Sequence, residues 1–517
     1  MNFNKKKLLV LGLVLALLIG MIAVPRGEAD VLSEGMQTVE AASEDRAKYM
    51  FLFIGDGMAH VQVNAAQVFT GNSKPGEIKP GKINFLDFPI TGVATTQDST
   101  SFCPDSASTA TSIAGGVKTH SGVIGLTQDK KNKVETIAET AKKNGKKVGI
   151  ISSVTLNHAT PAAFYANVES RGSYYEIGKQ MADSGFDYFA GGSLGARKDK
   201  SGDKKDLYDV MKEKGYKVTE TKADFERINA KTGKVYAVAE RLQDSGSMPY
   251  SIDQNKNDIS LANFVDKGIE VLDNDKGFFM MVESGKIDWA CHANDAATTA
   301  REVLGFADAI QVAIDFYNKH PEETLILITG DHETGGLTIG QSTTGYETAF
   351  EMLRNQKMSF TEMDNLIKAE LEKKPNLTFE EMKPLIRNWT SLIFPSQANN
   401  SIEYSLGEHE EMTLVLTDYE VNLIKNAFEK TKAIHNAGKP PEDMASQENY
   451  ILYGGYEPLS VTLTHILNNK SGVGWTSYSH TGVPVAVYAI GPTAETYGGF
   501  YDNTDIYHKM MKSFGYK

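Results

Sequence analysis

Two acid and histidine pairs could hold divalent metal ions. Asp288 and His292 lie four positions apart in VESGKIDWACHAND, residues 282–295, a spacing that places both side chains on one face of a helix. A second pair, Asp331 and His332, follows an apolar run and is flanked by glycines. Carboxylate and imidazole ligands without thiolate suit zinc. A pair with a four-residue spacing can also be an ordinary surface contact, so Asp288 and His292 alone leave both interpretations open.

Other candidate ligands surround these pairs. Asp56 lies between two glycines, where the backbone can approach a ligand closely. His480, in SHTG, follows an aromatic turn and could complete the first pair. Glu283 comes directly after the apolar run Phe278–Val282. The chain therefore offers enough oxygen and nitrogen ligands for more than one ion, and carboxylates with hydroxyls would also suit magnesium.

One serine has the surroundings of a nucleophile. Ser106 opens the small-residue run SASTATSIA, which can begin a closely packed helix. A serine at such a place is usually only a helix cap. Because no Gly-x-Ser-x-Gly motif surrounds it, a Ser-His-Asp hydrolase is not favoured. A metal ion could activate the hydroxyl instead.

The candidate ligands follow short apolar runs that alternate with helix-like stretches at 134–145 and 296–320. This alternation predicts an α/β fold with a mostly parallel central sheet flanked by helices on both faces. In such sheets ligands bind beyond the carboxyl ends of the strands. The expected strands are Tyr49–Ile54, Val148–Ile151, Phe278–Val282, Leu325–Thr329 and Val485–Ile490. The residues expected at their carboxyl ends are Asp56, His158, Glu283, Asp331 and His332.

A helical insertion is expected at about residues 341–470. Three serine or threonine residues there are each followed three positions later by glutamate, the pattern of a capping box. Such a segment more often covers a rim or an interface than carries out chemistry. The three pairs are Ser359 with Glu362, Thr378 with Glu381, and Thr417 with Glu420.

Composition and charge limit the classes of partner. The 517 residues carry a net charge of −13 without a long basic block, which argues against nucleic acid as a specific partner. An anionic substrate would therefore need strong local positive charge. Cys103 and Cys291 are the two cysteines, too few for a disulfide framework or a Cys-type zinc site. One bridge or two buried free thiols are both compatible with the sequence.

Residues 1–45 resemble an export signal. Three lysines at positions 5–7 precede an apolar stretch from Leu8 to Val24 and then Pro25. The segment could be cleaved or remain as an anchor, which would be the expected contact with a membrane. In either case we expect the protein to be exported: secreted, periplasmic or associated with the cell envelope. Residues 46–517 would form the functional domain.

Six motifs together resemble one enzyme family. FIGDGM, CPDSASTATS, NHATPAAFYANVESRG, VESGKIDWACHAND, TGDHETGG and SHTG occur in the order found in the metal-dependent alkaline phosphatases. The resemblance runs from about Tyr49 to Pro492, interrupted by the insertion. It implies hydrolysis of small phosphate monoesters at a site with two zinc ions and one magnesium ion. Members of this family are commonly homodimers.

The resemblance also implies roles for single residues. Ser106 would be the nucleophile that becomes phosphoserine, and Arg171 would grip two phosphate oxygens. The implied ligand sets are Asp288, His292 and His480 for the first zinc, Asp56, Asp331 and His332 for the second, and Asp56, Thr160 and Glu283 for magnesium.

Two positions depart from some members of the family. His158 stands where some have an aspartate, and Trp289 where some have a lysine. A histidine near the third site predicts weaker magnesium binding or acceptance of another divalent ion. A phosphodiesterase or sulfatase on the same scaffold is an alternative function, although Ser106 with Arg171 disfavours it. An exported, non-catalytic metal-binding protein is a second alternative.

Overall fold

The computed structural model describes residues 46–198, 201–395, 413–438 and 446–517. The expected export segment, residues 1–45, lies outside this range. Among the helices of the described ranges, none is long and apolar enough to cross a membrane.

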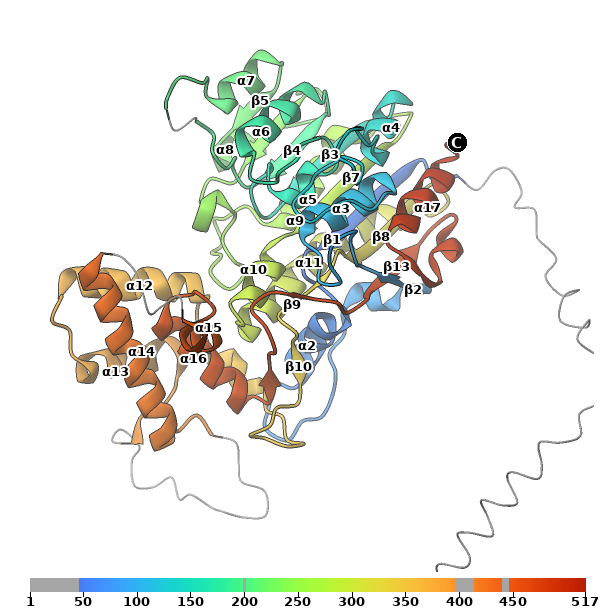
Figure 1. Ribbon diagram of the computed structural model, residues 1–517. Coiled ribbons are helices and arrows are strands. Elements are labelled where there is room, and N and C mark those ends of the chain that lie inside the picture. The colour runs from blue at the N-terminus through green and yellow to red at the C-terminus, as the bar shows by residue number, and fades with distance from the viewer. Residues whose placement is uncertain (1–45, 199–200, 396–412, 439–445) are drawn as a thin grey trace, which may run out of the picture. The chain divides into compact units, whose positions relative to one another are not determined.

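A ten-stranded sheet forms the centre of residues 46–517, in the order β14-β2-β13-β8-β1-β7-β3-β4-β6-β5 (Figure 1). Its described strand pairs are parallel except those made by β13, which runs antiparallel to both neighbours. The mostly parallel α/β fold is thus confirmed. The strands are β1 (Tyr49–Gly55), β2 (Ile90–Thr95), β3 (Lys147–Ser152), β4 (Tyr188–Gly191), β5 (Lys217–Thr219), β6 (Val235–Val238), β7 (Phe278–Ser284), β8 (Thr324–Gly330), β13 (Val485–Ile490) and β14 (Gly499–Asp502).

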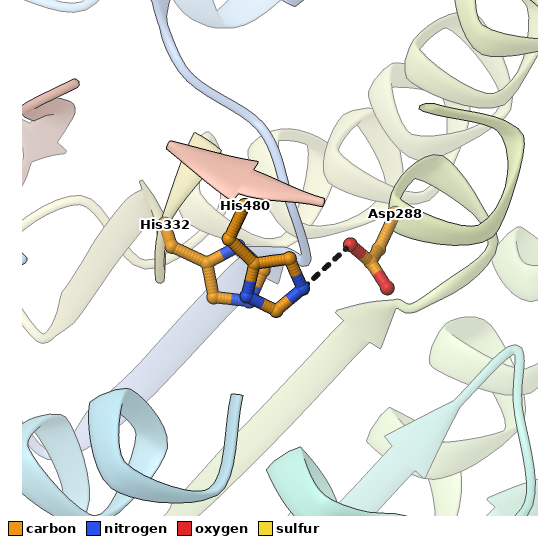
Figure 2. A group of neighbouring side chains, drawn as sticks. All are labelled: Asp288, His332 and His480. Carbon is orange, nitrogen blue, oxygen red and sulfur yellow. Dashed lines mark ion pairs between the residues drawn. The ribbon is translucent and has the colours of Figure 1, made fainter. Parts of the chain in front are cut away.

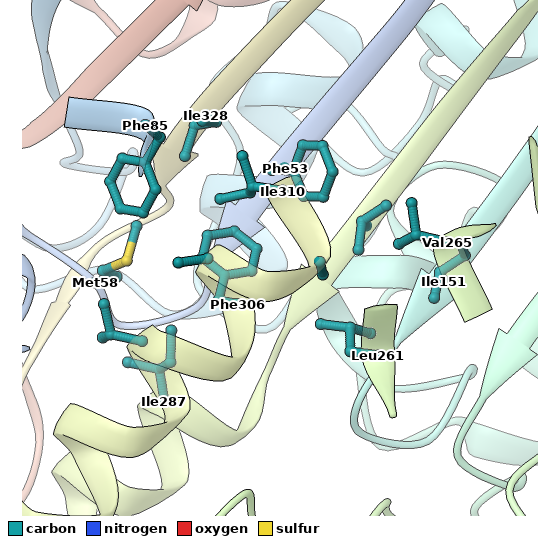
Figure 3. Packing of buried hydrophobic residues seen from close by; sticks show 14 of the residues in the cluster. Phe53, Met58, Phe85, Ile151, Leu261, Val265, Ile287, Phe306, Ile310 and Ile328 are labelled. Atoms are coloured by element: carbon teal, nitrogen blue, oxygen red, sulfur yellow. The ribbon is translucent and has the colours of Figure 1, made fainter. Parts of the chain in front are cut away.

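Side chains of β1 alternate between two apolar cores. Phe51 and Phe53 belong to one core and Leu52 and Ile54 to the other, as expected for a strand buried on both faces. Figure 3 shows Phe53 in the first core with Phe306 and other side chains from the helices. Helices α2 (His60–Gly71), α9 (Leu261–Leu272) and α11 (Ala296–Tyr317) contribute to this first core. Helices α3 (Ser106–Gly115), α4 (Ile137–Lys143), α6 (Tyr174–Asp183), α7 (Leu207–Glu213) and α17 (Thr504–Phe514) contribute to the second.

The carboxyl ends of the central strands lie in register. Gly55 at the end of β1 pairs with Ser284 of β7 on one side and with Gly330 of β8 on the other. The residues that follow these strands therefore emerge at one edge of the sheet. This register brings Asp331 beside the segment of Asp56: the Gly57 amide donates to Asp331 Oδ1 at 3.2 Å, although 274 positions separate the two residues along the chain.

The predicted insertion contains a helical group with its own apolar core (Figure 1). Reciprocal capping boxes form at Thr378 and Thr417 as expected. Ser359 caps its helix by accepting from the Glu362 amide, but its own amide donates to Asp253 at 3.0 Å. The N-terminus of this helix is thus hydrogen-bonded to a loop that is distant in the sequence. The helices are α12 (Phe360–Lys373), α13 (Phe379–Thr390), α14 (Asp418–Ala437), α15 (Gln447–Tyr453) and α16 (Pro458–Lys470).

Both cysteines are free thiols. Cys291 is buried, which agrees with the expectation of buried free thiols, whereas Cys103 is exposed. The expectation that both thiols are buried is therefore wrong for Cys103, which lies in the loop before α3 rather than in a core.

Candidate active site

The first predicted ligand pair lies on a short helix, α10 (Lys286–His292). Nε2 of His292 is 3.3 Å from Oδ1 of Asp288, as the four-residue spacing predicts. His480 lies on β12 (His480–Thr481), which pairs with β9 (Glu333–Thr334). Its Nε2 is 3.6 Å from Asp288 Oδ1 and 3.1 Å from His292 Nε2. The three residues implied for one zinc ion are therefore together. Figure 2 shows His480 facing Asp288 and lying against His332.

Backbone contacts fix the orientation of both imidazoles. Nδ1 of His292 lies 2.5 Å from the Tyr478 carbonyl, and Nδ1 of His480 lies 2.5 Å from the Pro104 carbonyl. A carbonyl only accepts, so each Nδ1 donates its hydrogen. In the neutral rings both Nε2 lone pairs then point toward Asp288. This arrangement suits a cation and resembles the way proteins orient metal-binding histidines.

Burial and neighbouring charges shift the pKa values of the two histidines in this group. Burial tends to lower the pKa of His292, but the Asp288 carboxylate outweighs it and raises that pKa to about 9. Burial, reinforced by the nearby His332, lowers the pKa of His480 to about 3. Asp288 thus favours positive charge beside His292 Nε2.

The second predicted set is fully buried. His332 Nε2 lies 3.3 Å from Asp56 Oδ1 and 3.4 Å from Asp331 Oδ2. Burial, with the Asp331 charge next in size, raises the pKa of Asp56 well above its usual range, and burial raises that of Asp331. Two carboxylates this close and this deep need a compensating positive charge.

A third group has buried oxygen atoms without partners. Ligand atoms of Asp56, His158 and Glu283 lie within 4.8 Å of one another. Asp56 Oδ2, Glu283 Oε1 and Thr160 Oγ1 have no hydrogen-bond partner among the described residues. Burial raises the pKa of Glu283 to about 7 although Ser152 donates a hydrogen bond to it. Such orphaned oxygens fit a hard cation.

Ser106 is buried where the ligand groups meet. Its Oγ lies 3.2 Å from His332 Nε2 and 3.4 Å from Asp56 Oδ1. It is the first residue of α3, and Asp105 before it caps the helix by accepting from the Ser108 amide. The usual role of a serine at this position is thus taken by Asp105, which leaves the Ser106 hydroxyl free for chemistry.

Arg171 brings positive charge to the same place. It donates through one terminal nitrogen to Asp105 at 3.0 Å, and the other lies 3.1 Å from His158 Nε2. Burial opposes the ionised carboxylate of Asp105, but the Arg171 charge holds its pKa below the usual value. Arg171, Ser106 and both predicted third-site neighbours line a cavity of about 430 Å³. The full lining is Ser106, His158, Arg171, Asp244, Ser245, Asp288, Trp289, His292, Phe360, Tyr456 and His480.

Several residues of this site were not expected from the sequence. Thr334 Oγ1 donates to Asp288 at 2.5 Å and lies 3.3 Å from His332 Nδ1, so it joins the two ligand groups. Thr109 Oγ1 donates to Asp331 at 3.1 Å. Thr334 stands only two positions after His332, so its position in the sequence could have predicted that it lies at the site. Nothing in the sequence predicts that Phe360 lies there, because it belongs to the insertion and is distant along the chain from every motif.

Buried carboxylates and oriented imidazoles around a serine, at the carboxyl edge of a parallel sheet, define a metal-dependent hydrolase. The model of the family described as alkaline phosphatase matches residues 47–191 and 184–516. Alkaline phosphatase 4 of Bacillus subtilis is 30% identical over 517 aligned residues, covering 95% of this chain and 96% of that protein. Alkaline phosphatase 3 of the same species is 29% identical, covering 93% and 92%. The chain belongs to the alkaline phosphatase family.

Solved structures agree with this membership. The cold-active alkaline phosphatase of the psychrophile Shewanella sp. superposes with a TM-score of 0.71 at 28% identity, covering 90% of this chain and 99% of that one. The enzyme of the Antarctic bacterium TAB5 gives a TM-score of 0.60 at 25% identity, covering 92% and 99%. The protein is therefore a metal-dependent phosphatase that hydrolyses phosphate monoesters.

Proposed function

We propose that hydrolysis proceeds through Ser106. Its Oγ attacks phosphorus, the bond to the alcohol oxygen breaks, and phosphoserine forms; water then attacks the same phosphorus and releases inorganic phosphate and the free serine. The position of Ser106 Oγ, 3.2 Å from His332 Nε2 and in one cavity with Arg171, is the observation that carries this proposal.

The proposed metal content is two zinc ions and one magnesium ion. Bound zinc would act as a Lewis acid that favours the serine alkoxide and the departing alcohol oxygen. The opposed lone pairs of His292 and His480, and the unpartnered oxygens beside Glu283, fit such cations. The proposed ligands are Asp288, His292 and His480 for one zinc, Asp56, Asp331 and His332 for the other, and Asp56, Thr160 and Glu283 for magnesium.

Arg171 is proposed to bind the phosphoryl group. Its planar guanidinium can donate to two nonbridging oxygens and neutralise their charge. Asp105 and His158 hold the side chain on the cavity wall, and this preorganisation supports the role. A cationic pocket of this kind also answers how a chain of net charge −13 accepts an anion.

The third site is proposed to bind magnesium less tightly than it would with an aspartate at position 158, or to accept another divalent ion. His158 supports this, because a histidine beside the site favours softer ions than magnesium. One solved variant of the TAB5 enzyme has Mg bound in the site called M3. Equilibrium dialysis against magnesium, with zinc present, tests the idea. Tight and selective retention of magnesium would contradict it.

Trapping phosphate on Ser106 tests the proposed reaction. Brief incubation with a labelled monoester at acidic pH, followed by peptide mass analysis, should place one phosphate on Ser106, and metal analysis should find zinc. Ser106→Ala should lose the label and at least about a thousandfold in kcat. A faster reaction with a phosphodiester or a sulfate ester would favour the alternative hydrolases. If no ester is hydrolysed, either with or without a chelator, the result would favour a non-catalytic metal-binding protein.

We further propose that residues 46–517 act as the catalytic domain of an exported homodimer. The lysines and apolar run within residues 1–45 support export. N-terminal sequencing of protein from culture medium and from membranes separates a cleaved signal from an anchor. Light scattering of the purified protein tests the dimer, and a monomeric mass would contradict it.

A further inference from the structure

The cavity beside Ser106 is larger than a phosphate needs. Its volume is about 430 Å³, which lies in the range of about 300–1,000 Å³ found for pockets that bind small organic molecules, whereas a phosphoryl group has only a few heavy atoms. The polar lining consists of Ser106, Arg171, the proposed ligands Asp288, His292 and His480, and also His158, Asp244 and Ser245. The remaining lining consists of three aromatic side chains, Trp289, Phe360 and Tyr456, which we call the aromatic wall.

The insertion supplies two members of the aromatic wall. Phe360 is the first residue of α12, and Tyr456 lies just before α16. Their rings meet edge to face with centroids 5.6 Å apart, and Tyr250 packs behind Phe360 at 5.8 Å. The Phe360 amide donates to buried Asp295 at 3.0 Å. The wall is thus fixed before substrate arrives, which limits the entropy lost on binding.

A buried lysine supports the third member. Lys286 has no exposed side-chain surface, and its Nζ lies 3.5 Å from the centre of the Tyr250 ring and 5.0 Å from that of Trp289. It also pairs with Asp244 and donates to Ser247 Oγ at 3.0 Å. This lysine links the cavity-lining Asp244 to the aromatic wall and restrains both.

We infer that the aromatic wall is the binding subsite for the alcohol part of the substrate. The preferred substrates are then phosphate monoesters whose alcohol carries an aromatic ring. Such a ring buries apolar surface and gains edge or face contacts, whereas a short aliphatic alcohol leaves the wall uncovered. This inference rests on the proposed function, since it places the phosphoryl group between Ser106 and Arg171.

Benzyl phosphate and ethyl phosphate test the inference. Both release a primary alcohol, so their ratio of kcat/KM reports binding of the alcohol part rather than leaving-group chemistry. The wild-type ratio should favour benzyl phosphate at least about tenfold, the scale by which a well-fitted apolar group discriminates substrates. Phe360→Leu and Tyr456→Leu should each lower the ratio at least about threefold.

Tyr419→Leu is the matched control. Tyr419 is an aromatic residue of the insertion that is 71% exposed and does not line the cavity. Its replacement should leave the ratio unchanged. A wild-type ratio near one would overturn the inference while leaving the proposed function intact. If neither benzyl phosphate nor ethyl phosphate is hydrolysed, the result would instead count against the proposed function.

Inhibition of the wild-type protein provides a test that does not depend on variants folding. In 2-phenylethylphosphonate and propylphosphonate a CH2 group replaces the bridging oxygen of the two esters, so neither can be hydrolysed by this route. The inhibition constant of 2-phenylethylphosphonate should be at least about tenfold lower than that of propylphosphonate. Equal inhibition constants would overturn the inference whatever the variants do.

Discussion

Nε2 of His292 and Nε2 of His480 face each other at 3.1 Å, each held by a backbone carbonyl at its other ring nitrogen. Two imidazole lone pairs at that distance repel unless a proton or a cation lies beside them. The raised pKa of His292, about 9, shows how strongly Asp288 attracts such a charge. A cation bound by Asp288, His292 and His480 would take up the lone pairs of both rings and offset the carboxylate charge, so the arrangement fits the proposed ligand set.

Metal removal should accordingly destabilise the folded protein. An ion that binds only the folded state stabilises it by about 4 kcal/mol at a thousand times its Kd. Urea denaturation after exhaustive chelation should show lower stability than with added zinc. Superimposable denaturation curves would contradict metal binding at these residues.

Thr334→Val should weaken metal binding. The threonine hydroxyl donates to Asp288 and lies 3.3 Å from His332 Nδ1, so valine removes a contact from both groups while keeping the shape. Loss of such an outer contact typically costs about 10- to 100-fold in metal affinity. Competition with a chromogenic zinc chelator measures it. Thr334→Ser keeps the hydroxyl and should retain most of the affinity; an equal loss in both variants would refute the role.

Arg171→Lys should weaken phosphate binding. Lysine keeps the charge but loses the planar fork and cannot contact Asp105 and His158 together as arginine does. Because one charged hydrogen bond is worth about 1.5–3 kcal/mol, the inhibition constant for inorganic phosphate should rise about 10- to 100-fold. Arg227→Lys, at an exposed arginine paired with Asp224, serves as the control and should leave that constant unchanged.

Glu302→Gln should stabilise the protein at alkaline pH. Burial raises the pKa of Glu302 from 4.5 to about 7, so the folded state holds its proton where the unfolded state has lost it. Stability therefore falls as pH rises through this window, by about 3 kcal/mol in full. Glutamine should remove that loss at pH 9 and change stability little near pH 4.

Chemical denaturation at the two pH values checks this expectation. Glu322→Gln, on the exposed surface, should give no such pH-dependent gain. An identical pH dependence in wild type and Glu302→Gln would show that Glu302 does not titrate as its burial implies.

The sequence predicted those parts of the fold that carry a strong local signal. Buried parallel strands such as β1 appear as continuous apolar runs, and the spacing of Asp288 and His292 already implied a shared helix face. The ends of β7 and β8 could also be predicted, because their continuous apolar runs stop where polar residues and glycines begin. These elements hold most of the predicted ligands, which explains why the ligand groups were anticipated.

Other parts depend on tertiary structure that no short segment encodes. The strands β4, β5 and β6 are three or four residues long and leave too little pattern to recognise. The reversed direction of β13 follows from its connection rather than its own residues. Phe360 and Tyr456 reach the cavity only because the insertion packs beside α10 through contacts such as that between Phe360 and Asp295.

The pairing of His480 with Thr334 has a consequence for biosynthesis. His480 follows the whole insertion along the chain, so this proposed ligand is synthesised well after the segment Glu333–Thr334 with which it pairs. A prematurely terminated chain would lack this histidine and remain inert.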